Sequence, residues 1–195
     1  MIRWFWRSCF SRRYSGGVLR NLKTDIGEIR KIRDGQDSKL DSFPAAVGSD
    51  FFQENSFRID SVNTKTFVLM LANRNPLSFV SAGPIDLEKV LRDYNRNEFH
   101  HLYPRAYLRE LQAGPNGSKH DVHCLANFSF MSRVDNETLG GVAPSVYRTK
   151  MPNGAPFDSI LENALCPYSL FDDNFDNFVA ARSQKLAEEA NRLIA

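Results

Sequence analysis

The chain of 195 residues is 42% hydrophobic and 12% aromatic and carries a formal net charge of +2. This composition is sufficient for a packed core and excludes a wholly disordered chain, and the length fits one ordinary domain with appendages. The three cysteines form no CxxC pair, which excludes a zinc knuckle of the usual spacing and disfavours a disulfide framework.

No apolar run reaches membrane-spanning length, and the first residues are too charged for a secretory signal. We therefore expect a cytoplasmic protein with no membrane partner. Residues 1–33 hold nine Lys or Arg against two acidic residues, whereas the remainder holds 16 basic and 21 acidic residues. This asymmetry is equally compatible with a polyanion bound at the N-terminal face and with a solvated basic helix.

Residues 1–95 are predicted to be helical. Trp4, Phe5 and Phe10 indicate the end of a buried helix, so the chain is expected to continue a longer protein or to form half of a two-chain assembly. Apolar residues at three- and four-residue steps predict an amphipathic helix that stops at Gly35. Further helices are expected at 49–55, at 64–74 with Asn63 or Thr64 as cap, and at 83–95 with Pro84 near the first turn.

Residues 96–150 differ from their flanks, because "NEFHHLY" (97–103) and "CLANFSFM" (124–131) predict two short strands. Between and after them we expect a brief helix at 104–111, turns at 112–121 and a short helix at 132–141. In residues 151–195 we expect first a loop, which starts upstream near Pro144, and then a long amphipathic helix. Its inner face would hold Phe175, Phe178, Val179, Leu186, Ala190 and Leu193. The expected class is α+β, mostly helical.

All four histidines lie between residues 100 and 123, and His100 and His101 stand side by side at the end of the first predicted strand. Imidazole binds metals and exchanges protons near neutral pH, which makes this cluster the candidate site. Adjacent strand residues point to opposite faces, so both rings serve one site only if the strand ends there, as Pro104 favours. His120 and His123 are expected to pack against or cap the loop before the second strand.

The order of these residues resembles the HNH, or ββα-metal, nuclease motif. In that motif a histidine pair ends one strand, an Asn opens the next, and an Asn or His ligand follows nine residues later; here these are His100-His101, Asn127 and Asn136. "FWRSCFSRRYSGG", "NEFHHLYPRAYL", "LANFSFMSRVDN" and "APSVYR" are similar to the C-terminal nuclease region of GmrSD-type modification-dependent restriction proteins. The likeness extends over nearly the whole chain and implies a central ββα-metal unit at 96–150.

The resemblance implies a metal-dependent endonuclease that hydrolyses DNA, by nicking or double-strand cleavage, in a restriction or phage-defence system. His101 would be the general base, His100 and Asn136 would bind one divalent metal, and Asn127 would fix the loop and aim His101. Mg²⁺ or Mn²⁺ is the expected ion, and the histidine ligand leaves Zn²⁺ or Ni²⁺ open. The implied partners are DNA and a ParB-like nucleotide-hydrolysing domain or subunit.

Two features depart from the motif, since Leu139 stands where a lysine is frequent and the segment from Arg105 to Asp121 is longer than in minimal versions. Arg133, Arg148 or Lys150 are the candidates for the missing positive charge toward substrate. By the same likeness, 144–147 would brace the metal helix, although this stretch also fits a plain loop. Two other functions stay open: a nucleic-acid-binding or assembly module with a vestigial nuclease site, and an RNase of the same fold.

Overall fold

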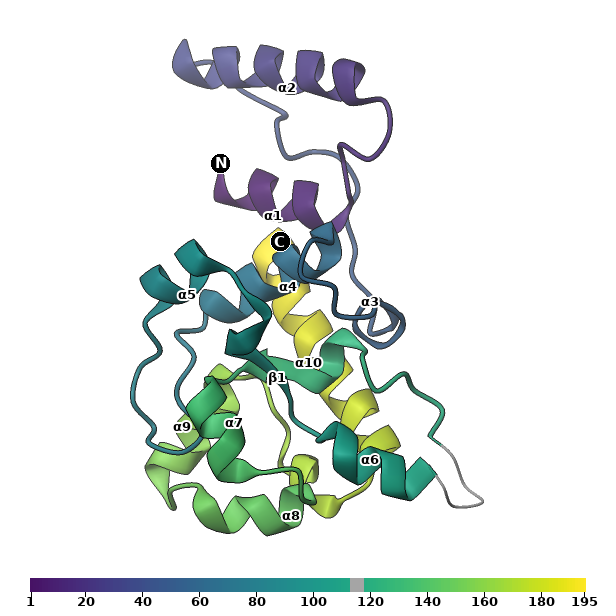
Figure 1. Ribbon diagram of the computed structural model, residues 1–195. Helices are drawn as coiled ribbons and strands as arrows, with labels where there is room; N and C mark the ends of the chain where they lie inside the picture. The colour runs from purple at the N-terminus through teal and green to yellow at the C-terminus, as the bar shows by residue number, and fades with distance from the viewer. Residues whose placement is uncertain (113–117) are drawn as a thin grey trace. The chain divides into compact units, whose positions relative to one another are not determined.

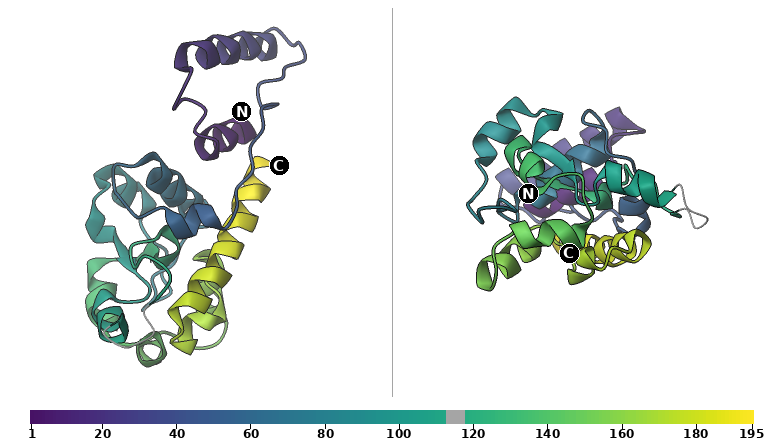
Figure 2. Two further views of the ribbon diagram at one scale, coloured as in Figure 1. Left: turned by 90° about the vertical axis from the view of Figure 1, so that its right-hand side faces the viewer. Right: turned by 60° about the horizontal axis from the view of Figure 1, so that its bottom comes forward.

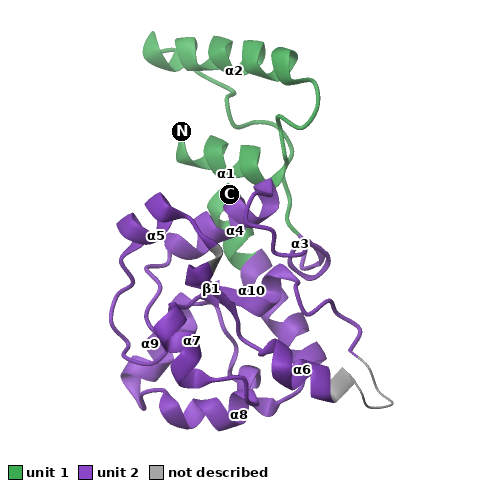
Figure 3. Ribbon diagram, viewed as in Figure 1, with its two compact units in different colours: residues 1–47, 188–195 green, residues 48–187 purple. Residues whose placement is uncertain are grey.

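A computed structural model describes residues 1–112 and 118–195 (Figure 1), so part of the turn predicted at 112–121 lies outside the described residues. The chain divides into two compact units (Figure 3). Unit 1 contains residues 1–47 and 188–195, and unit 2 contains residues 48–187. The described secondary structure is mostly helical with one two-stranded antiparallel sheet, which confirms the α+β class. The predicted segment 96–150 lies within unit 2.

The N-terminal part of unit 1 forms two helices that lie side by side, α1 (Ile2–Phe10) and α2 (Val18–Arg33) (Figures 1 and 2). In α1, Trp6 and Phe10 are buried and their rings stack with centroids 6.2 Å apart, whereas Phe5 is exposed. The predicted helix at the start of the chain is confirmed. Its aromatic residues are partly buried and partly exposed.

The apolar stripe of α2 is exposed, although the helix itself is confirmed. Leu19 is 84% exposed and Ile26 49%, and the one buried side chain of α2 is Asp25. Asp25 accepts hydrogen bonds from Trp4 Nε1 (3.1 Å), from the Arg13 guanidinium (2.6 and 2.8 Å) and from the Tyr14 hydroxyl (2.5 Å). The inward-facing side chain of α2 is therefore polar. Its hydrogen bonds supply the donors that a buried carboxylate needs.

Unit 1 is expected to lose stability in acid through Asp25. Burial alone would raise the Asp25 pKa, but the hydrogen bonds from Arg13, Tyr14 and Trp4 outweigh it and hold that pKa below its ordinary value. A carboxyl with a lowered folded-state pKa contributes stability above its unfolded pKa of about 4, and this contribution is lost as the pH falls through the folded value. The measurement is urea unfolding at pH 7 and pH 3 by tryptophan fluorescence, since both tryptophans lie in unit 1.

The matched variants are Asp25→Asn and Asp37→Asn, the latter at an exposed position. Asp25→Asn should shrink the stability difference between the two pH values, because its amide does not titrate. Asp37→Asn should leave that difference as in the wild type. An undiminished acid loss in Asp25→Asn would contradict the assignment.

Unit 2 begins with three helices, α3 (Asp50–Glu54), α4 (Val62–Ala72) and α5 (Leu87–Asp93), which confirms the predicted ones. The cap predicted for α4 is wrong. Ser61 is the cap, and its Oγ accepts a hydrogen bond from the Thr64 N–H at 3.1 Å, since a serine oxygen before the first turn satisfies an otherwise unpaired amide. Asp86 caps α5 in the same way, at 3.0 Å from the Lys89 N–H.

The sheet pairs β1 (Phe99–His101) with β2 (Phe128–Phe130), so both predicted strands are present. The register sets Phe99 opposite Phe130, His100 opposite Ser129 and His101 opposite Phe128. A one-turn helix, η1 (Arg96–Glu98), precedes β1, and η2 (Leu125–Asn127) precedes β2. The phenylalanines cluster, with ring centroids of Phe99 and Phe130 5.1 Å apart and those of Phe57 and Phe128 4.2 Å apart. This cluster anchors the ribbon that carries the histidines.

Each strand of the sheet is followed in sequence by a short helix. The brief helix predicted after the histidines is α6 (Arg105–Gln112), and the one predicted after the second strand is α7 (Arg133–Leu139). Ser132 caps α7 by accepting a hydrogen bond from the Asp135 N–H at 3.0 Å. Gly140 ends α7 with a φ of 81°, a conformation that glycine adopts without a steric penalty.

The proline-rich loop predicted before the last helix is wrong. The residues form α8 (Pro144–Tyr147), η3 (Arg148–Lys150), α9 (Ala155–Asn163) and η4 (Tyr168–Asp172). Pro144 and Pro156 occupy the first turns of α8 and α9, where the missing N–H costs nothing. The last helix, α10 (Phe175–Ile194), is confirmed; its part within unit 2 flanks one side of that unit (left view of Figure 2). All the predicted inner-face residues are buried except Leu193, which is half-buried.

Candidate functional site

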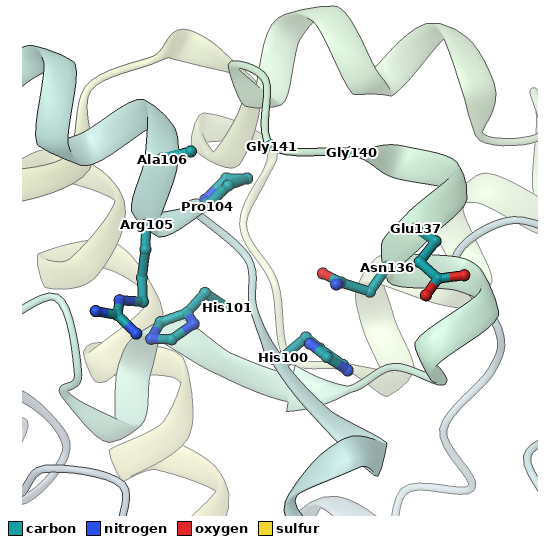
Figure 4. Close-up of a pocket in the computed structure, with 9 residues that line it drawn as sticks. All are labelled: His100, His101, Pro104, Arg105, Ala106, Asn136, Glu137, Gly140 and Gly141. Carbon is teal, nitrogen blue, oxygen red and sulfur yellow. The ribbon is translucent and has the colours of Figure 1, made fainter.

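The histidine pair opens onto a pocket of about 360 Å³ in unit 2 (Figure 4). Its walls come from the end of β1, the first turn of α6, and α7 with the two glycines that follow it. The lining residues are His100, His101, Pro104, Arg105, Ala106, Asn136, Glu137, Gly140 and Gly141. Three of the four residues that the sequence singled out for chemistry therefore share one cavity, and the fourth, Asn127, is buried beside it.

His101 stands on one side of this pocket. Its ring packs on Phe128, the residue opposite it in the sheet, with centroids 4.2 Å apart. Its Nε2 lies 3.2 Å from Nδ1 of His123, in the loop before β2. Packing and a hydrogen bond together hold the ring in one orientation.

His100 lies on the other side, because neighbouring strand residues face opposite ways. Figure 4 shows the two rings directed apart, with His100 below the carboxamide of Asn136. The expectation that the strand turns there and brings both rings to one point is therefore wrong, because both residues stay in the ladder with β2. His100 Nε2 lies 2.9 Å from the carbonyl oxygen of Asn97. A carbonyl only accepts, so Nε2 carries the proton and the lone pair of the neutral ring is on Nδ1, the form that a metal ligand requires.

Asn136 projects from the middle of α7 into the pocket (Figure 4). Among the described residues no hydrogen-bond partner is recorded for its carboxamide. The helix that presents it is fixed at both ends: Ser132 caps its start, and Lys150 Nζ donates to the carbonyls of Thr138 (2.9 Å) and Leu139 (3.0 Å) at its end. A cation there also complements the partial negative charge of the helix terminus.

Asn127 is fully buried and joins the two chain segments that carry the site. Its Oδ1 accepts a hydrogen bond from the Tyr103 N–H at 2.8 Å, and its Nδ2 donates to the carbonyls of Tyr103 (3.2 Å) and Val122 (2.9 Å). The amide thus links the backbone just after His101 to the loop that holds His123. Tyr147 braces the same turn by donating from its hydroxyl to the Leu102 carbonyl at 2.8 Å, so 144–147 contacts the histidine turn.

The basic residues expected to face substrate have other partners. Arg133 pairs with Glu137 at 2.7 Å, Arg148 stacks on Phe157 with its guanidinium carbon 3.6 Å from the ring centroid, and Lys150 closes α7. None of the three lines the pocket, whereas Arg105 does, on the same side as His101 (Figure 4).

The pocket brings together two side chains of the kinds that bind divalent cations, the imidazole of His100 from β1 and the carboxamide of Asn136 from α7. Among the described residues no cluster of three or more His, Cys, Asp or Glu side chains suits a metal. Two such donors would suit an ion such as Mg²⁺ or Mn²⁺, which keeps several waters and takes oxygens from substrate phosphates. They do not match a closed tetrahedral zinc site, which takes four protein ligands.

Sequence reasoning missed two residues of this arrangement. His123 carries no motif position, and only the fold brings it to His101; its place four residues before Asn127 was the available signal. Arg105 directly follows Pro104 in the sequence, but the cations predicted to face substrate were Arg133, Arg148 and Lys150.

Comparisons with known proteins give no match to any family model, curated protein or solved structure. No helix of the described residues has both the length and the apolar character needed to cross a membrane.

Proposed function

We propose that this protein is a metal-dependent HNH-type endonuclease that hydrolyses phosphodiester bonds in DNA. The observation that carries the proposal is the shared pocket, with an oriented imidazole and Arg105 on one side and an imidazole–carboxamide pair on the other. β1, β2 and α7 occur in the chain order of the ββα-metal unit, with α6 and η2 between the two strands. Together with the resemblance of the flanking segments, this favours a role in restriction or phage defence.

Each side of the pocket has a separate task in this proposal. A phosphodiester repels anionic nucleophiles, so His101 takes the proton from an attacking water, a step worth about 100- to 10,000-fold. Arg105 binds a phosphate oxygen and holds the scissile group beside His101. A divalent ion held by His100 and Asn136 would, when bound, stabilise charge on the non-bridging and leaving oxygens.

Cleavage of supercoiled plasmid with Mg²⁺ or Mn²⁺ tests the proposal. The wild type should convert plasmid to nicked or linear product, and EDTA should stop the reaction. His100→Ala should raise the metal concentration for half-maximal cleavage by about 10-fold or more, because one of two protein ligands is lost. His120→Ala is the matched control, since His120 lies outside the pocket lining.

Two outcomes oppose the proposal. Salt-dependent DNA binding with no metal-dependent cleavage would indicate a binding module with an inactive site. Cleavage of single-stranded or structured RNA in preference to plasmid would move the activity to RNA.

A further inference from the structure

The loop before β2 contains a histidine that the motif does not use. His123 Nδ1 lies 3.2 Å from Nε2 of His101, and the two ring centroids are 5.2 Å apart with planes inclined by 58°. His123 is absent from the residues that line the pocket, whereas His101 is among them. His123 therefore contacts His101 without lining the pocket itself.

The backbone of His123 is fixed on both sides. Its N–H donates to Asp121 Oδ1 at 2.9 Å, and its carbonyl accepts a hydrogen bond from the Phe57 N–H at 2.7 Å. Asp121 is itself fixed by the Ser56 hydroxyl, which donates to its other oxygen at 2.6 Å. Partial burial would raise the pKa of Asp121, but the bonds from Ser56 and His123 lower it below its ordinary value, so this support stays ionised.

We propose that His123 is a positioning residue for His101, setting the orientation and the tautomer of its ring for the nuclease reaction. The inference rests on the proposed function for its catalytic consequence. A hydrogen bond between two imidazoles requires that one nitrogen donates and the other accepts. Whichever ring donates, the contact couples the tautomer of His101 to that of His123; without the partner, both tautomers and other ring orientations become accessible.

The choice of variants separates loss of the contact from loss of the side chain. In His123→Asn, the amide places a polar atom where Nδ1 stood and retains a partner for His101. In His123→Leu, a side chain of similar bulk has no polar atom. His120→Leu, in the same loop, controls for loss of an imidazole.

In plasmid cleavage, His123→Leu should lower kcat by about 10- to 100-fold with KM nearly unchanged, because a misplaced catalytic group slows the step but does not weaken binding. His123→Asn should recover most of the rate, and His120→Leu should match the wild type. Histidine side-chain NMR should show one His101 tautomer in the wild type and in His123→Asn, and a mixture of tautomers in His123→Leu.

The NMR readout works without activity and so separates the two proposals. If the wild type does not cleave nucleic acid, the proposed function fails, and the His101 spectrum still decides whether His123 orients it. If the wild type cleaves and His123→Leu changes neither kcat nor the His101 spectrum, the positioning role is wrong. Tight Zn²⁺ binding by the wild type that His123→Leu abolishes would also overturn it, because the two nitrogens would then be metal ligands.

Discussion

His101→Ala should lower plasmid cleavage by about 100- to 10,000-fold, the range expected when a general base is removed. DNA affinity should change little, because Arg105, His100 and Asn136, which hold the phosphate and the metal in the proposed mechanism, all remain. The fold should also persist, since His101 lies at the end of a three-residue strand and is half-buried at a pocket wall. Single-turnover cleavage and filter binding on the same preparation measure the two quantities.

Two comparisons make this prediction specific. His120→Ala removes an imidazole from the same region without touching the pocket and should cleave at the wild-type rate. His101→Gln keeps a polar side chain that does not take protons at neutral pH, so it should be as slow as alanine. Wild-type cleavage by His101→Ala would show that another group activates the water.

The sequence predicted those parts of the fold that depend on local patterns. Strand patterns predicted β1 and β2, apolar spacing predicted α2 and α10, a continuous apolar run predicted α4, and the glycines after α7 marked its end. The loop predicted before the last helix was wrong, because Pro144 and Pro156 lie in the first turns of helices, and proline fits that position as well as it fits a loop. The direction in which α2 faces was likewise hidden, since the network that turns Asp25 inward depends on Trp4, Arg13 and Tyr14 from outside the helix.

The site shows the same division. The motif spacing predicted that His100, His101 and Asn136 lie together, and all three line one pocket. Such a prediction succeeds because short elements joined in a fixed order place their ends near one another. Spacing carries no information on contacts made across the chain, so the His123 contact and the position of Arg105 appeared only in the structure. Arg133, Arg148 and Lys150, the cations expected to face DNA, lie in or shortly after α7 in the sequence. Each side chain contacts a nearby residue of the protein instead.

One buried residue far along the chain holds the segment that carries Asn127. Arg182 of α10 is fully buried, and its guanidinium donates to the carbonyls of Ala126 (2.7 Å), Phe128 (2.7 Å) and Ala164 (2.9 Å). Burial lowers the pKa of Arg182, yet an arginine stays charged because its reference value is so high. Its planar fork satisfies carbonyls on η2, β2 and the end of α9 together.

Arg182→Met should therefore destabilise the protein by about 3–5 kcal/mol, a large part of the usual total of about 5–15 kcal/mol. Methionine fills much of the volume but leaves the buried carbonyls of Ala126 and Phe128 unpaired, at about 1–3 kcal/mol each, and leaves that of Ala164 with only the weak donor Cys166 Sγ at 3.6 Å. The loss is partly offset because no charge is buried. Arg182→Lys should fall between, since an ammonium lacks the planar fork. Urea unfolding followed by far-UV circular dichroism measures this loss, with exposed Lys185→Met expected within about 0.5 kcal/mol of the wild type. Wild-type stability in Arg182→Met would mean that these carbonyls find other donors.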